Sequence, residues 1–103
     1  MSDLHSEAAD KLFDAILALK DREECYRFFE DLCTITEMQA MSQRFHVARL
    51  LRQGLVYNEV GRLSGASSAT ISRVRRNILD NEAGGAMREL IQRQGLVRGP
   101  EDD

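Results

Sequence analysis

The chain has 103 residues, 43% of them hydrophobic, which suffices for one small domain whose own surface covers its core only marginally. No apolar run approaches the roughly 18 residues of a membrane span, and no basic-then-apolar leader opens the chain. We therefore expect a soluble, cytoplasmic protein with no membrane partner. Cys25 and Cys33 stand eight residues apart, too far along one helix for a disulfide, so we expect buried, reduced thiols.

The composition favours an all-α fold, because good helix formers are abundant and the single proline, Pro100, lies near the C-terminus. The first helix is expected over 6–19, where apolar residues recur with helical period. Asp21, followed three residues later by Glu24, resembles a capping box. This box predicts a second helix that extends to about Leu32.

A second capping box, formed by Thr34 and Glu37, predicts a third helix from Ile35 to about Gln53, which Gly54 ends. The apolar spacing assigns some of its residues to the core, namely Met38, Met41, Phe45, Ala48 and Leu51. The arginines are expected on the other side, namely Arg44, Arg49 and Arg52.

The next helices follow at short intervals. A short fourth helix is expected over 57–64, and Gly65 breaks the chain after it. Ser67 caps a fifth helix, which we expect to extend to about residue 80. The last helix is predicted over 86–94.

We therefore expect a single all-α domain over 1–98 with about six helices, a helix-turn-helix at 57–77 and a disordered acidic tail at 99–103. In the stretch YNEVGRLSGASSATISRVRR, Gly65 can adopt the positive φ of a tight turn, and Gly61 stands where the two helices cross with little room. Four apolar positions of this motif are expected to face the core, namely Val60, Ala66, Ile71 and Val74.

The outward side of the second helix is suited to a DNA groove. Its hydroxyl-rich first turn can approach the groove floor, its backbone N–H groups can meet a phosphate, and its arginines can reach phosphates or guanine O6 and N7. Residues 44–76 hold seven arginines and one acid, Glu59, whereas 1–43 hold 10 acids and 4 bases. The alternative is a solvated helix whose arginines pair with the acidic parts of the chain. The predicted DNA contacts are Ser67, Ser68, Thr70, Ser72, Arg73, Arg75 and Arg76.

Two stretches, TITEMQAMSQRFHVARLLRQG (34–54) and GASSATISRVRR (65–76), resemble the Trp repressor family, and more closely its YerC/YecD branch. The resemblance covers about 34–80. It implies a six-helix subunit that intertwines with a second copy as a homodimer. The two helix-turn-helix motifs of the dimer would then face successive major grooves about 34 Å apart.

The resemblance also implies where an effector would bind, because the Trp repressor holds tryptophan between its central and recognition helices. The matching positions are Thr34, Arg44, Thr70 and Arg73. After the second arginine the repressor has a glycine, where this chain has Val74, whose side chain is expected to project towards the indole space. The turn is also one residue shorter. We therefore expect no tryptophan corepressor and no other cofactor, and the sequence identifies no small-molecule effector.

The expected function is sequence-specific binding of double-stranded DNA as a transcription regulator, expected to be a repressor and nucleoid-associated when bound. The alternative is a helical protein-interaction module without DNA binding, whose binding surface would be the acidic first third and the apolar helix 6–19. An enzyme is not expected. His5 and His46 are the only histidines, no Cys/His cluster has metal spacing, and no glycine-rich phosphate loop follows a strand.

Overall fold

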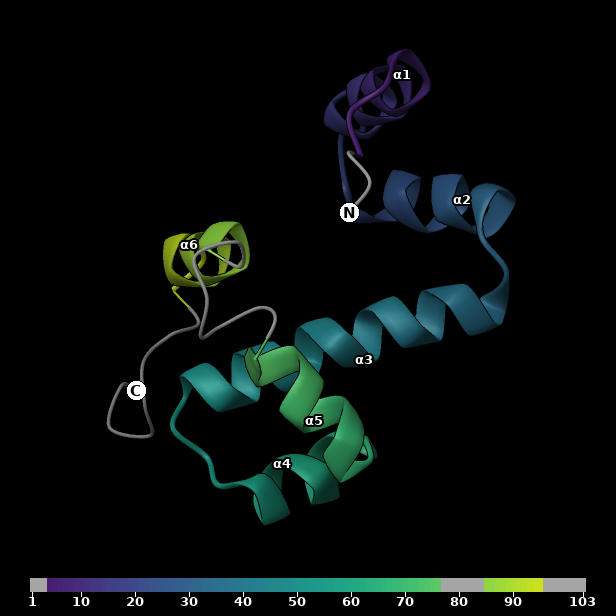
Figure 1. The fold of residues 1–103 in the computed structure, drawn as a ribbon. Helices are drawn as coiled ribbons and strands as arrows, with labels where there is room; N and C mark the ends of the chain where they lie inside the picture. Colours follow the sequence, from purple (N-terminus) through teal and green to yellow (C-terminus); the bar gives the residue numbers. More distant parts are fainter. Residues whose placement is uncertain (1–3, 77–84, 96–103) are drawn as a thin grey trace. The chain divides into compact units, whose positions relative to one another are not determined.

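The structure is a computed structural model that describes residues 4–76 and 85–95, and every regular element within these ranges is helical (Figure 1). The predicted all-α class is confirmed. The chain divides into two compact units, Met1–Met38 and Gln39–Asp103, each described here by itself. The single domain over 1–98 stays a prediction. The expected tail at 99–103 and the expected end of the fifth helix at 77–80 lie outside the described residues.

In the first unit, side-chain caps start the helices where the sequence predicts them. The Asp21 carboxylate accepts a hydrogen bond from the Glu24 N–H at 2.9 Å, while the Glu24 carboxylate accepts from the Lys20 N–H at 2.9 Å rather than from Asp21. The box of Thr34 and Glu37 is reciprocal, at 2.8 and 3.0 Å. These two caps start α2 (Arg22–Leu32) and α3 (Ile35–Arg52), while the Ser6 hydroxyl accepts from the Ala9 N–H at 3.0 Å and starts α1 (Glu7–Leu17).

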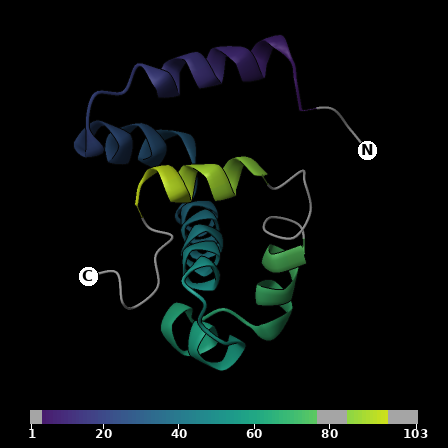
Figure 2. The same cartoon turned by 90° about the vertical axis from the view of Figure 1, so that its left-hand side faces the viewer.

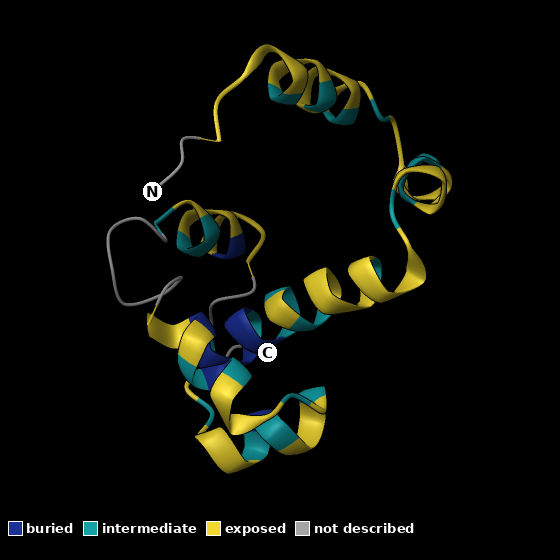
Figure 3. Ribbon diagram, turned by 45° about the vertical axis from the view of Figure 1, so that its right-hand side comes forward, coloured by how far each residue is buried: buried dark blue, intermediate teal, exposed yellow. Residues whose placement is uncertain are grey.

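Within this unit, α1 and α2 contain no buried residue (Figure 3). Their apolar side chains, Phe13, Leu17, Tyr26 and Leu32 among them, are largely exposed. The expectation of buried thiols is wrong for Cys25, which is exposed, and Cys33 is only half-buried. The physical reason is that α2 has no interior within its own unit, so a helical apolar stripe does not imply burial there.

The second unit contains the rest of α3, followed by α4 (Tyr57–Ser64), α5 (Ser68–Val74) and α6 (Gly85–Arg93). Figures 1 and 2 show α4 and α5 side by side, and these two helices contact each other. The core takes residues from all four helices, namely Val47, Ala48, Leu50, Leu51, Val60, Ile71, Val74 and Ile91. Phe45, Leu55, Ala66 and Met87 pack against it.

The predicted apolar face of α3 is only partly right. Ala48 and Leu51 are buried, but so are Val47 and Leu50, whereas Met41 is exposed. Burial in α3 is confined to 47–51, so the C-terminal part of this helix is enclosed over a wider arc than a single stripe.

Candidate nucleic-acid interface

The turn between α4 and α5 is held by one glycine and one serine. Gly65 has φ +75°, the left-handed conformation that the sequence predicts for it. The Ser64 hydroxyl donates to the Val60 carbonyl at 2.6 Å and accepts from the Ala66 N–H at 3.1 Å. The Gln43 side-chain amide donates to the Ser64 carbonyl at 3.4 Å, which links the turn to α3. These bonds therefore hold the end of α4 and the start of the turn in place.

The four apolar positions of the motif are placed as predicted. Val60, Ile71 and Val74 belong to the buried core, and Ala66 is half-buried against it. Because these side chains occupy the inner side of α4 and α5, the polar residues between them are left on the outer side. The spacing of the predicted helix-turn-helix is confirmed.

Gly61 is less confined than its position at the helix crossing suggests. A Cβ atom there would lie 3.6 Å from the Ala66 carbonyl oxygen and 3.7 Å from Ile71 Cδ1, which are ordinary contact distances. The expectation of little room is therefore wrong for a single methyl group.

Gly61→Ala is expected to stabilise the protein by about 0.5–1 kcal/mol, because alanine loses less conformational freedom than glycine in a helix interior. Thermal unfolding should show a higher Tm. Gly65→Ala is the matched control, with an expected loss of about 1–2 kcal/mol because of its positive φ. A Tm for Gly61→Ala at or below that of the parent chain would show that a methyl group does not fit beside Ala66 and Ile71.

The first turn of α5 is closed by its own hydroxyl groups. The Ser67 hydroxyl accepts from the Thr70 N–H at 3.1 Å and lies 3.2 Å from the Thr70 hydroxyl oxygen, to which it donates. The predicted cap is confirmed. These two hydroxyls hold the helix start, whereas Ser68 is exposed on the same turn and Ser72 is half-buried.

The three arginines of the predicted DNA contacts, Arg73, Arg75 and Arg76, are all exposed. The Arg75 N–H continues the helical bonding to the carbonyls of Ile71 and Ser72. Arg73 therefore stands on α5 itself, with Arg75 and Arg76 directly after it. Long cationic side chains at the end of such a helix can extend towards a polyanion.

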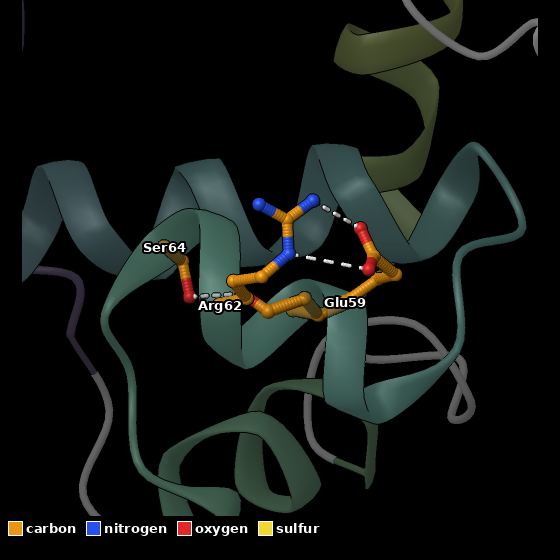
Figure 4. Close-up of polar contacts among 4 residues, drawn as sticks. Glu59, Arg62 and Ser64 are labelled. Carbon is orange, nitrogen blue, oxygen red and sulfur yellow. Dashed lines mark hydrogen bonds and ion pairs between the residues drawn. The ribbon is translucent and has the colours of Figure 1, made fainter.

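The first helix of the motif carries an ion pair that the sequence reasoning missed (Figure 4). Arg62 Nε and Nη2 donate to the two carboxylate oxygens of Glu59 at 3.2 and 2.7 Å. This hydrogen bonding lowers the pKa of Glu59 below its ordinary value and raises the pKa of Arg62. The i, i+3 spacing on a predicted helix was the signal that could have revealed the pair.

Two arginines of α3 are less exposed than their charge suggests. Arg49 and Arg52, which the sequence places on the side opposite the apolar residues, are half-buried, and the Nε atom of each is buried without a hydrogen-bond partner. Their long aliphatic stems can cover apolar core surface, which a count of charged residues does not register.

The predicted effector pocket takes residues from both units, and it stays a prediction. Thr34 belongs to the first unit, whereas Arg44, Thr70 and Arg73 belong to the second. Val74 is 1% exposed and packs in the core. Its side chain thus points inward, as the motif predicts. The absence of a tryptophan corepressor stays a prediction.

Within the described residues, no group of three or more His, Cys, Asp or Glu side chains could hold a metal ion. No helix in the described parts of the chain is long and apolar enough to cross a membrane.

The helices and the exposed arginines together define an all-α protein with a helix-turn-helix. The family described as Trp repressor protein matches residues 7–94. The chain belongs to this family, whose members are helix-turn-helix DNA-binding regulators rather than enzymes.

Individual relatives agree with this placement. The chain is 58% identical over 73 residues to the uncharacterized protein YerC of Bacillus subtilis (strain 168), a match that covers 71% of this chain and 70% of that protein. The crystal structure of a candidate Trp repressor from Staphylococcus aureus is 47% identical, with a TM-score of 0.83 over 90% of this chain and 91% of that one. A TrpR-like protein from Eubacterium eligens ATCC 27750 is 44% identical, with a TM-score of 0.84 over 92% and 96%. The predicted resemblance to the YerC branch is confirmed.

Proposed function

We propose that the protein is a sequence-specific regulator of transcription, acting as a repressor, that reads the major groove of double-stranded DNA with α5. The observation that carries the proposal is the exposure of Ser68 and Arg73 on α5, and of Arg75 and Arg76 directly after it, beside a well-held turn. Phosphate contacts would supply most of the affinity and base-edge contacts the specificity. Binding should therefore weaken steeply with salt.

We further propose that the working form is a homodimer. The support lies in the first unit, where α1 and α2 bury nothing and present Phe13, Leu17, Tyr26 and Leu32 to solvent. Exposed apolar side chains on two successive helices are typical of a surface that another chain covers. A second copy would bring a second α5 to the next major groove, about 34 Å away.

The same exposed surface favours the second candidate function, a protein-interaction module that binds no DNA. The two functions differ in their response to salt, because burial of apolar side chains does not release counterions. Retention on duplex DNA that falls steeply with salt supports the regulator. Partner binding that is insensitive to salt, without retention on DNA, supports the module.

The experiment that tests the proposal is selection from a random duplex DNA pool at moderate salt without added ligand. We expect enrichment of a two-fold symmetric site, which would support both the regulator and the dimer. Enrichment of a single unpaired half-site would contradict the dimer alone. No enrichment, even at low salt, would contradict binding without a corepressor, and a repeat with tryptophan added separates a missing corepressor from the interaction module.

A further inference from the structure

The ion pair on α4 lies on the outer side of the first helix of the motif. The side chains of Arg62 and Glu59 are 66% and 42% exposed, whereas Val60 is buried and Ser64 is half-buried on the inner side. Figure 4 shows the Arg62 guanidinium turned to the Glu59 carboxylate, with both dashed bonds on one edge of the guanidinium. Each carboxylate oxygen therefore takes one N–H donor from the same arginine.

This pair adds little to the stability of the protein. An ion pair exposed to water on both sides contributes little to stability, because water and salt screen the attraction. The pair should have a larger effect on the affinity for a polyanionic partner than on stability, because Glu59 offsets the positive charge of Arg62. Glu59 is the only acid among residues 44–76, and it stands against one of their seven arginines.

In a helix-turn-helix, the first helix crosses the sugar-phosphate backbone while the second enters the groove. A guanidinium on the outer side of α4 is therefore suited to reach a phosphate. The edge that Arg62 offers to Glu59 is also the edge that binds two phosphate oxygens. Glu59 and a phosphate thus compete for the same donors.

We propose that Arg62 is a phosphate-contacting residue which Glu59 holds until DNA docks. In the free protein the Nε and Nη2 donors bind the carboxylate, and on a duplex they transfer to the oxygens of one backbone phosphate. The Glu59 carboxylate is then hydrated and lies close to the DNA phosphate, which repels it. Glu59 therefore lowers affinity for every duplex, whatever its sequence, and so restrains non-specific binding. This inference rests on the proposed function.

The test uses the full-length protein and a short mixed-sequence duplex, with affinity measured by fluorescence anisotropy over a series of salt concentrations. Arg62→Gln should make the slope of log affinity against log salt shallower by about 0.9 per subunit, as expected for one lost phosphate contact. Glu59→Gln should tighten binding about two- to fivefold at low salt. Arg62→Lys keeps the charge but loses the two-bonded fork, so it should retain the slope of the parent chain.

The matched controls are Arg22→Gln and Glu30→Gln in α2, which make the same changes in net charge. Circular dichroism establishes that each variant is folded. If Arg62→Gln does not fold, the affinity of Glu59→Gln still tests the restraint. An unchanged slope for Arg62→Gln overturns the phosphate contact. Binding of Glu59→Gln that is unchanged or weaker overturns the restraint by Glu59. No binding of the parent chain to any duplex at low salt overturns the proposed function itself, and this inference with it.

Discussion

Ile71→Ala is expected to lower the free energy of unfolding by about 2–5 kcal/mol. Ile71 is 2% exposed, and its Cδ1 atom approaches α4 beside Gly61. Truncation would leave a cavity between α4 and α5, which the bonds around Ser64 keep from closing. Small domains are stable by about 5–15 kcal/mol, so the loss would be a large share of the total. Urea unfolding followed by far-UV circular dichroism, at one fixed protein concentration, measures it.

Two other variants calibrate this result. Ile71→Val removes a single methyl group and should cost about 0.5–1.5 kcal/mol. Leu63→Ala truncates a side chain of α4 that is largely exposed and should cost less than about 1 kcal/mol. Equal losses for Ile71→Ala and Leu63→Ala would show that Ile71 does not join the two helices of the motif.

The double variant Arg73→Ala with Arg76→Ala is expected to bind duplex DNA at least about tenfold more weakly than the parent chain. An arginine that contacts a base contributes about 1–3 kcal/mol of binding free energy. An arginine that contacts a phosphate changes the slope of log affinity against log salt by about one. Both side chains are exposed on or directly after α5, so alanine should leave the core intact. Anisotropy titrations on the selected site, repeated at several salt concentrations, measure the affinity and the slope.

Arg22→Ala with Arg27→Ala is the control, because it removes the same charge from α2. The single variant Arg76→Ala should give a smaller loss and a slope shallower by about 0.9 per subunit if Arg76 contacts a phosphate. An unchanged slope would remove Arg76 from the predicted contacts. Equal weakening in the double variant and the control would mean that net charge, and not α5, determines binding.

The helix boundaries could be predicted because they depend on residues close together in the chain. Asp21, Thr34 and Ser67 each accept the N–H of the residue three positions on, so the cap and its helix are read from four consecutive residues. Gly65 likewise ends α4 through its own φ. Because these signals are local, α2 begins and α4 ends where the sequence predicts, whereas no side-chain cap marks the start of α4 at Val56.

The burial of α3 and α2 could not be predicted in the same way. Helical periodicity shows which residues share a side, but not whether another element covers that side. No residue of α2 is buried within its unit, and Cys25 on its apolar stripe is exposed. In α3 the neighbours enclose more than one side, so Arg49 and Arg52 have buried Nε atoms.

The sequence predicts the core positions and the exposed arginines of the candidate site, but not two of its polar contacts. The core positions and the exposed arginines of α5 follow from spacing alone. The bond from Gln43 to the Ser64 carbonyl joins residues 21 apart, and no local pattern predicts it. The pair of Glu59 and Arg62 has a local signature, but a count of charges hides it by treating the two residues as independent.

The hydroxyl contacts at the start of α5 affect the cost of docking. Ser67 binds both the N–H and the hydroxyl of Thr70, so the first turn of the recognition helix is fixed before any partner arrives. A segment that orders only on contact must lose conformational entropy at that moment, which lowers its affinity. Here that entropy is lost during folding, so in the proposed function the start of α5 would meet a groove already ordered.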